Sequence, residues 1–483
     1  MKRSILLAGT AILAACASSP ANLSGLTGER VDFFAQAPDA PAEWVARGVA
    51  GKAPEGDWLS QFNDPVMTSL VAESLAHNPS LKSRVAAVRA AEAATRTARS
   101  AGRPTLDASL SAGTTSTGFT TPTGNDRANS EIYGVGVDAS WELDLWGRIG
   151  ASVNASQADY AASEADLAAA ELSLAAQTAI AWINLNEALA QENVAALTYD
   201  ARDRVRLLTE RRFQRGLAEA LDVRTARSAV ASAEAAIAAR RQITGETARR
   251  LEILLGRYPS AELTAPAEIP VLGPLAPEGN PALLLSRRPD IAASEARIEA
   301  AGMRAEAARL AMLPALRLTA SASTSESEFA DAFDPELIAA RLVGNLIAPI
   351  FTGGRLDAQR DAAVAQAEAA VANYASATLA AWAEVENALA ADTYLAAQED
   401  AQARSLEEAR LAEELAERQY TSGTITIFNL IDAQTRRLNA ESQLVSARAN
   451  RAANRIAYHL ALGGGLPVLT AANAPPPTED AAE

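Results

Sequence analysis

The apolar positions of this chain follow two different periods, and the same succession of periods occurs twice. Over residues 66–102 and again over 286–312, apolar side chains recur three and four positions apart, which is the spacing of an amphipathic helix. Pro104 and Pro314 follow these stretches and are expected to end the helices. Each half of the chain is therefore predicted to open with a helical segment.

After each helical segment the apolar period changes to two. Leu106, Ala108 and Leu110 alternate with polar residues, and so do the residues from Tyr133 to Leu143. Alternation over about 9 to 14 residues is typical of a transmembrane β-strand, although a soluble hairpin with one buried face also alternates. Four such strands are predicted, at about residues 104–113, 131–146, 314–326 and 337–352.

A long stretch without proline follows each pair of predicted strands. The two stretches cover about residues 148–215 and 355–421, and as helices each would be roughly 100 Å long. They end at Gly216 and Gly423, in the position of a common helix C-terminal stop. Returning helices are then predicted at about 221–256 and 428–462.

The two halves are tandem copies of one unit. Phe213-Gln214-Arg215-Gly216 in the first half and Tyr420-Thr421-Ser422-Gly423 in the second are 207 residues apart. Further upstream the offset is 210 residues, and it relates Pro79 to Pro289. Each half therefore repeats the order helix, strand pair, long helix and returning helix.

Composition favours long helices packed side by side over a compact globule. Aromatic residues make up 5% of the chain, while alanine dominates stretches such as 161–181 and 362–381. Alanine is the best helix former, but it fills a wide core poorly.

The net charge is −16 and no stripe of Lys and Arg is present, so nucleic acid is not expected as a partner. The acidic balance fits solubility, and it also fits a negatively charged channel lumen.

The first residues have the pattern of an export signal. Lys2 and Arg3 precede an apolar run from Ile5 to Ala15, which is too short for a permanent membrane helix. The run ends in Leu13-Ala14-Ala15-Cys16, which resembles a bacterial lipobox, and Cys16 is the one cysteine of the chain. We expect cleavage before Cys16 and a covalent lipid on this residue, with no other cofactor. Ala17 favours sorting to the outer membrane.

The predicted organisation contains no further membrane-spanning helix, because no other stretch of 18 apolar residues free of charge is present. The predicted segments are a lipoprotein signal peptide (1–15), a lipidated N-terminal segment (16–65), a first repeat (66–256), a linker (257–285), a second repeat (286–462) and a flexible C-terminal tail (463–483).

The number of predicted strands requires more than one copy of the chain if they cross a membrane. Open sheet edges do not persist in hydrocarbon, and four strands are too few to close a barrel. Two copies would supply eight strands, and the interior of an eight-stranded barrel is filled by side chains. Three copies would supply twelve strands, and a twelve-stranded barrel leaves an open lumen. If the protein conducts a solute, a homotrimer is the smallest plausible assembly.

Several motifs resemble those of the TolC-type outer-membrane factors. The similarity covers nearly the whole mature chain and is strongest with the lipoprotein subgroup that serves resistance-nodulation-division (RND) efflux pumps, the NodT-like outer membrane efflux lipoproteins. The matching motifs are Trp58 with Phe62 and Asp64-Pro65, Asn78-Pro79 with Leu81, Asp144-Leu145-Trp146-Gly147-Arg148, Arg287-Arg288-Pro289-Asp290-Ile291, Pro349 with Phe351 and Gly353-Gly354-Arg355, and Asp432-Ala433-Gln434.

The resemblance implies a mainly helical fold with transmembrane strands. Three copies would form a 12-stranded outer-membrane β-barrel continued by a 12-helix periplasmic α-barrel, with an equatorial belt near residues 257–285. The expected partners are outer-membrane lipid, a periplasmic adaptor and an inner-membrane RND pump. The adaptor would dock at the helix ends, where the docking residues would be Gly216, Leu217, Gly423 and Thr424.

The resemblance also implies a gate at the periplasmic end. Asp222, Tyr420 and Asp432 match gate positions of the family, while Asn429 and Ile425 stand where some members have aspartate and arginine. These two departures weaken an ion-pair lock but leave a ring of three Asp432 side chains. Asp222 has a second interpretation as the N-cap of the returning helix.

The residues do not favour an enzyme or a metal site. His77 and His459 are the two histidines, and neither belongs to a cluster with metal-ligand spacing. We find no nucleophile elbow, phosphate-binding loop or dinucleotide motif.

The expected function is passive conduction of small molecules, such as drugs and toxic compounds, from the periplasm to the exterior. Ducts for type I protein secretion or heavy-metal export remain alternatives, although three methionines in the mature chain argue against a copper relay.

Overall fold

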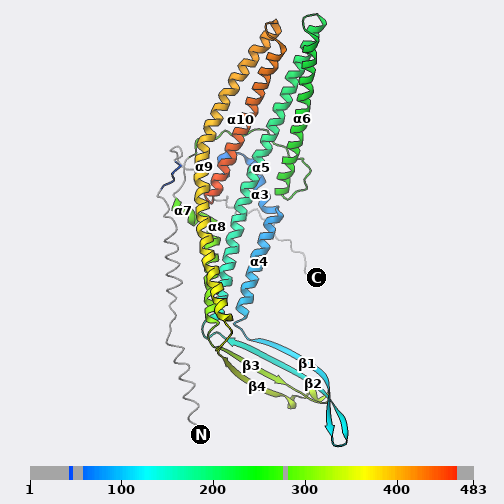
Figure 1. Cartoon of the computed structure of the whole chain (residues 1–483), viewed down its shortest axis with the longest axis vertical. Helices are drawn as coiled ribbons and strands as arrows, with labels where there is room; N and C mark the ends of the chain where they lie inside the picture. Colours follow the sequence, from blue (N-terminus) through cyan, green and yellow to red (C-terminus); the bar gives the residue numbers. More distant parts are fainter. Residues whose placement is uncertain (1–42, 47–57, 276–280, 465–483) are drawn as a thin grey trace. The chain divides into compact units, whose positions relative to one another are not determined.

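The computed structural model describes residues 43–46, 58–275 and 281–464 (Figure 1). The predicted signal peptide and Cys16 lie outside these residues. The described part of the chain forms two compact units. The sheet unit contains Glu92–Asp159 and Ser294–Ser376, and the paired-helix unit contains most of the remaining residues, in particular Tyr160–Ala293 and the chain from Ala377 onward.

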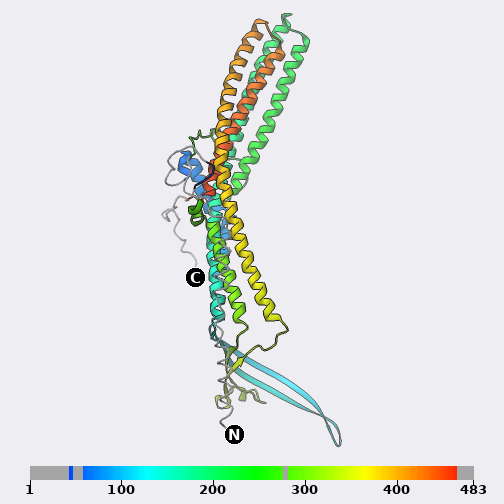
Figure 2. The ribbon, with the colours of Figure 1, turned by 60° about the vertical axis from the view of Figure 1, so that its left-hand side comes forward.

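The sheet unit contains one antiparallel sheet in the order β1-β2-β3-β4. Strand β1 covers Thr105–Thr121, β2 Gly124–Leu143, β3 Ala315–Ser323 and β4 Ala339–Ile347. The first two strands are longer than predicted, since their pairing continues to Thr121 opposite Gly124 (Figures 1 and 2). The stretch between the first two predicted strands, residues 114–130, is therefore mostly strand, because its threonines suit a strand as well as a turn.

The register of the sheet separates an apolar face from a polar face. Val137 lies opposite Ala108 and Ala322, and Leu342 lies opposite Ala320. Most of the intervening positions carry polar side chains, although Val343 lies opposite Thr319. The polar residues include Asp107, Asp138, Ser140, Arg317, Thr319, Ser321 and Arg341. Because directly opposed residues share a face, the alternation seen in each strand becomes a property of the whole sheet.

The helical segment that opens each repeat is two helices, where the sequence predicted one. The first consists of α3 (Pro65–His77) and α4 (Pro79–Ser100), preceded by the short 3-10 helix η1 (Trp58–Phe62). The second consists of α7 (Pro281–Arg287) and α8 (Pro289–Leu310). The breaks fall directly before Pro79 and Pro289, because a residue that precedes proline is driven out of the helical conformation.

The long helices follow the predicted bounds closely. Helix α5 covers Arg148–Gln214 and α6 Ala220–Leu254, while α9 covers Arg355–Ser422 and α10 Ile427–Ala461. The turns between them lie in the paired-helix unit, where α6 returns beside α5 and α10 returns beside α9 (Figure 1).

The two repeats use the same joint at the far ends of α6 and α10. The side-chain amide of Asn78 donates to the carbonyl of Leu254 at 2.8 Å, and the guanidinium of Arg288 donates to the carbonyl of Ala461 at 2.9 Å. Asn78 and Arg288 lie at the breaks between two helices, and each caps the C-terminal end of a returning helix, α6 or α10. Each thereby satisfies a backbone carbonyl that has no partner within that helix. The duplicated sequence therefore folds into duplicated contacts.

The largest core cluster lies around these joints. It includes Trp58, Met67, Trp182, Leu251 and Ile456, all nearly fully buried. The irregular segment from 257 to 275, the described start of the predicted linker, packs on this cluster through several of its apolar residues. Helix α7 begins at Pro281, within the predicted linker, and ends at Arg287, within the predicted second repeat. In the described residues no helix is long and apolar enough to cross a membrane.

Candidate gate at the helix ends

The two turns that join the long and returning helices have the same backbone structure. Gly216 and Gly423 have φ angles of +74° and +81°, which glycine adopts without strain. The amide of Leu217 donates to the carbonyl of Arg212 at 2.9 Å, and the amide of Thr424 donates to the carbonyl of Gln419 at 2.9 Å. These are the bonds of a Schellman motif, so the four predicted docking residues form two equivalent exposed turns.

Asp222 does not occupy the N-cap of α6. Glu219 is the N-cap, and Asp222 lies three residues later, where its carboxylate accepts a hydrogen bond from the amide of Glu219 at 3.0 Å. In the second repeat Thr426 is the N-cap of α10, and its hydroxyl donates to the side-chain oxygen of Asn429 at 2.6 Å. Asp222 and Asn429 are therefore equivalent residues of the first helical turn. The N-cap interpretation of Asp222 is wrong, because Asp222 is the third residue after the N-cap.

Tyr420 connects the two long helices near their ends. Its side chain is buried, and its hydroxyl lies 2.7 Å from the hydroxyl of Thr209 on α5. Because Thr209 donates to the carbonyl of Val205, Tyr420 is the donor in this contact. Arg212 donates to the carbonyls of Tyr420 and Thr421 at 2.8 and 3.2 Å, and its guanidinium lies 5.1 Å from the centre of the tyrosine ring.

We call Thr209, Arg212 and Tyr420 the helix-end clasp. The sequence identified Tyr420 but missed Thr209 and Arg212, because these two residues meet Tyr420 across more than 200 positions of the chain. Arg212 carried a signal, since a basic residue in the last turn of a helix suits its free carbonyls. Here, however, it reaches the carbonyls of the other long helix.

An apolar cluster lies beneath the clasp. Its buried members are Val205, Ala226, Ala416, Tyr420, Ile427 and Leu430. Ile425, which stands where the family resemblance led us to expect an arginine, packs against this cluster. The position that lacks the expected charge is therefore filled by a side chain that contributes apolar contact instead.

Asp222 and Tyr420 line one cleft without a hydrogen bond between them in the described structure. The cleft has a volume of about 530 Å³ and is also lined by Leu217, Ile425 and Thr426. Asp432 lies further along α10, where it is 61% exposed and pairs with Arg436 at 2.8 Å. The structure thus brings two predicted gate residues to one cleft and leaves Asp432 on an exposed surface.

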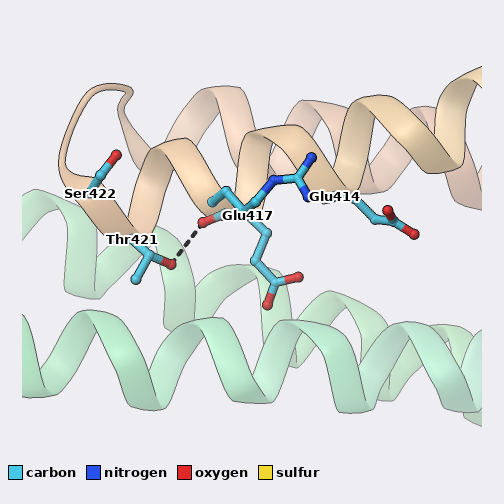
Figure 3. Close-up of a pocket in the computed structure, with 5 residues that line it drawn as sticks. Glu414, Glu417, Thr421 and Ser422 are labelled. Carbon is cyan, nitrogen blue, oxygen red and sulfur yellow. Dashed lines mark hydrogen bonds between the residues drawn. The ribbon is translucent and has the colours of Figure 1, made fainter.

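A second open pocket lies on the last turns of α9. It has a volume of about 540 Å³ and is lined by Glu414, Glu417, Arg418, Thr421 and Ser422 (Figure 3). The hydroxyl of Thr421 donates to the carbonyl of Glu417 at 2.7 Å. Figure 3 shows the carboxylates of Glu414 and Glu417 beyond this turn, so the pocket presents acidic groups beside the tip.

Among the described residues no group of three or more His, Cys, Asp and Glu side chains has the arrangement of a metal site. His77 lies exposed in the last turn of α3. His459 is buried and stacks on Trp58 with 6.2 Å between ring centres.

Two comparisons by sequence find similar proteins. The family model described as "Outer membrane efflux protein" matches residues 70–257 and 280–464. The pyoverdine export outer membrane protein OpmQ of Pseudomonas aeruginosa is 32% identical over 476 residues, covering 96% of this chain and 97% of OpmQ. The toluene efflux pump outer membrane protein TtgF of Pseudomonas putida is 31% identical, covering 85% of this chain and 86% of TtgF.

Solved structures of channels are similar as well. The outer-membrane channel OprN superposes with a TM-score of 0.78 at 29% identity, covering 89% of this chain and 98% of OprN. The transmembrane channel CusC superposes with a TM-score of 0.76 at 27% identity, covering 89% of this chain and 100% of CusC. Sequence and fold comparisons therefore agree over most of the chain.

Proposed function

This chain belongs to the outer membrane efflux protein family, and from that membership we propose that it is the outer-membrane channel subunit of a tripartite RND-type pump. The observation that carries this proposal is the match of the family model to both repeats. The channel conducts small molecules passively from the periplasm to the exterior. Family membership makes the chain an outer-membrane transport protein, and an adaptor and an inner-membrane pump complete the path.

The proposed assembly is a homotrimer whose sheets close one barrel. Its support is the four-stranded sheet, which has β1 and β4 as unpaired edges in a single copy. An exposed edge offers free amide and carbonyl groups to another strand. Three copies would supply twelve strands, with the apolar face toward lipid and the polar face toward the lumen. The long helices would continue the lumen as a 12-helix tunnel.

The proposed gate combines packing with polar contacts. Its support is the helix-end clasp, which holds the end of α9 on α5, and the apolar cluster that contains Tyr420. Three Asp432 side chains around one axis would narrow the entrance and attract cations. The adaptor would dock on the turns at Gly216 and Gly423, where Leu217 is 64% exposed.

The names of the relatives indicate only a broad class of transported molecule. OpmQ is named for pyoverdine export, TtgF for toluene efflux, and CusC of Escherichia coli for cation efflux at 28% identity over 411 residues. Two of these three names refer to organic molecules, which favours small organic cargo here. Cation export is the second candidate, and it is supported by the similarity to CusC in both sequence and structure.

Accumulation of a fluorescent dye in the native host tests the function. Deletion of the gene should raise the cellular content of ethidium, and expression of the wild-type chain in trans should restore it. A parallel culture with added copper measures sensitivity to cations. Higher copper sensitivity with unchanged ethidium would replace the organic cargo by cations. Loss of a secreted protein with both unchanged would favour protein secretion.

A further inference from the structure

A polar cleft between three helices of the paired-helix unit is not explained by the channel function. It has a volume of about 270 Å³ and receives residues from α5, α6 and α10. Two arginines, Arg202 and Arg240, line it, and no carboxylate does. The net charge of the chain is −16, so a cleft lined by two arginines and no carboxylate is unusual for its composition. Such a cleft lacks groups that would balance the two positive charges.

Arg202 lacks the partner that other arginines of this region have. Within the described part of the chain its guanidinium makes two long contacts, both at 3.3 Å, to the carbonyl of Ala229 and the hydroxyl of Thr435. Its Nε is buried and has no hydrogen-bond partner among the described residues. By contrast, Arg206 on the same helix pairs with Asp203 and Glu210 at 2.8 and 3.0 Å.

The environment of Arg202 disfavours its charge in the absence of an anion. Burial lowers the pKa of Arg202 below its usual value, and no nearby carboxylate opposes this effect. Arg240 is half-buried and makes no ion pair within the described residues. A bound anion would offset the cost of keeping these guanidinium groups in the cleft, because charge-assisted hydrogen bonds are the stronger ones.

The remaining lining residues fit a small oxyanion. Ser232 and Asn439 contribute polar side chains at the exposed rim of the cleft, while Val194 and Ala233 are buried in its wall. The volume is below the range of about 300–1,000 Å³ that is typical of drug-sized ligands. The cleft therefore suits a sulfate-sized or carboxylate-sized group rather than a larger organic molecule.

We propose that Arg202 and Arg240 form a binding site for a small free anion that carries a carboxylate or sulfate group. The site does not depend on the gate, the adaptor or the cargo. It binds the anion between α5 and α6 and connects these helices to α10. The anion supplies the negative partner that the chain itself provides to Arg206 but not to Arg202.

Calorimetric titration of the full-length protein in detergent with sodium sulfate, at constant ionic strength, tests the site. Wild type should bind one sulfate per chain, and Arg202→Gln and Arg240→Gln should each weaken binding about tenfold or more. Arg241→Gln is the matched control, because Arg241 is the next residue of α6, is 70% exposed and pairs with Glu192 at 3.2 Å. Its sulfate affinity should equal that of wild type.

Succinate in place of sulfate gives the carboxylate arm of the same titration. Arg202→Lys, which keeps the charge, should retain part of the affinity and guards against misfolding of the glutamine variant. Absence of sulfate and succinate binding in wild type, or equal losses in all three glutamine variants, would overturn the proposal. Absence of binding combined with poorer assembly of Arg202→Gln would instead assign the arginines to a carboxylate of a neighbouring copy, and would overturn a free-anion site.

Discussion

At the residue scale, single buried side chains contact the segments at the ends of the returning helices α6 and α10. Glu252 in the last turn of α6 is buried, and its carboxylate accepts backbone hydrogen bonds from Ala261 and Glu262 at 2.8 and 2.9 Å. Burial raises the pKa of Glu252, but these hydrogen bonds outweigh it, so the pKa is lowered overall. The equivalent residue of α10, 207 positions later, is His459, which is buried on Trp58 instead. The same position thus carries opposite chemistry in the two repeats.

His459 makes the stability of the fold depend on pH. Burial, aided by the charge of Arg455, lowers the pKa of His459 to about 4 from 6.5. The unfolded chain therefore binds a proton more readily, so this contribution is fully present above about pH 6.5 and is lost as the pH falls toward 4. At pH 5 the loss should be about 2 kcal/mol.

Thermal unfolding of wild type and His459→Gln at pH 7.5 and 5.0 measures this effect. The difference between the two pH values should be smaller in the variant, which has no ionisable group at this position. An equal difference in both proteins would assign the acid sensitivity to other groups.

Cys16 is the proposed site of lipid attachment. In the sequence it ends the apolar run Leu13-Ala14-Ala15. Cys16→Ser should abolish incorporation of labelled palmitate in growing cells, and persistent labelling of this variant would contradict the lipid assignment. Part of the variant should stay in the membrane fraction, since a single acyl chain anchors a protein weakly and the barrel would contribute independently.

At the scale of elements, the helix-end clasp holds α9 against α5 through few contacts. Tyr420→Phe removes the hydrogen bond to Thr209, and Asp222→Ala removes the carboxylate that accepts the hydrogen bond from the amide of the N-cap residue Glu219. Together they should raise single-channel conductance without changing the yield of assembled protein, because the apolar cluster remains. Unchanged conductance would place the constriction elsewhere.

Asp432 is expected to act through its charge at the entrance. Asp432→Ala should change conductance and reduce block by multivalent cations such as hexamminecobalt, since the proposed ring attracts them. Arg436→Gln is the matched control, because it removes the partner at 2.8 Å but keeps the carboxylate. Equal block in wild type and Asp432→Ala would contradict the ring.

The strands should differ in how their two faces tolerate charge. Val137 and Leu342 lie on the apolar face and are 41% and 76% exposed in the single chain. Arginine at either position should cost about 2–4 kcal/mol if that face meets lipid near the midplane. Thr319→Arg, on the polar face opposite Ser140, should have little effect. Denaturant unfolding from detergent micelles measures the three variants, and equal costs would contradict a lipid-facing apolar surface.

At the scale of the whole molecule, the proposed trimer would pair the open sheet edges of β1 and β4 with those of other copies. Native mass spectrometry in detergent should give three chains per particle, since three copies are the fewest whose strands enclose a lumen. A stable monomer or dimer under these conditions would contradict the trimer. Crosslinking between cysteines placed on β1 and β4 would identify the closing edge, and a bond between different chains is the expected product.

The sequence by itself determined the elements and their duplication. Periodicity and proline positions predicted α5, α6, α9 and α10 closely, because long alanine-rich helices depend mainly on local propensity. Alternation predicted four strands for a similar reason, but it did not predict the threonine-rich extension of β1 to Thr121 or the start of β2 at Gly124. The family resemblance proposed Tyr420 as a gate residue, and the structure adds that its side chain is buried.

Only the tertiary structure decided which distant residues meet. The pairing of Tyr420 with Thr209 and Arg212, the turn position of Asp222 and the isolation of Arg202 all depend on how helices pack. These contacts join residues that are far apart in the chain or depend on cap geometry, and local pattern carries no information on either. The physical reason is that propensity and periodicity act within one element, whereas burial and pairing are shared between elements.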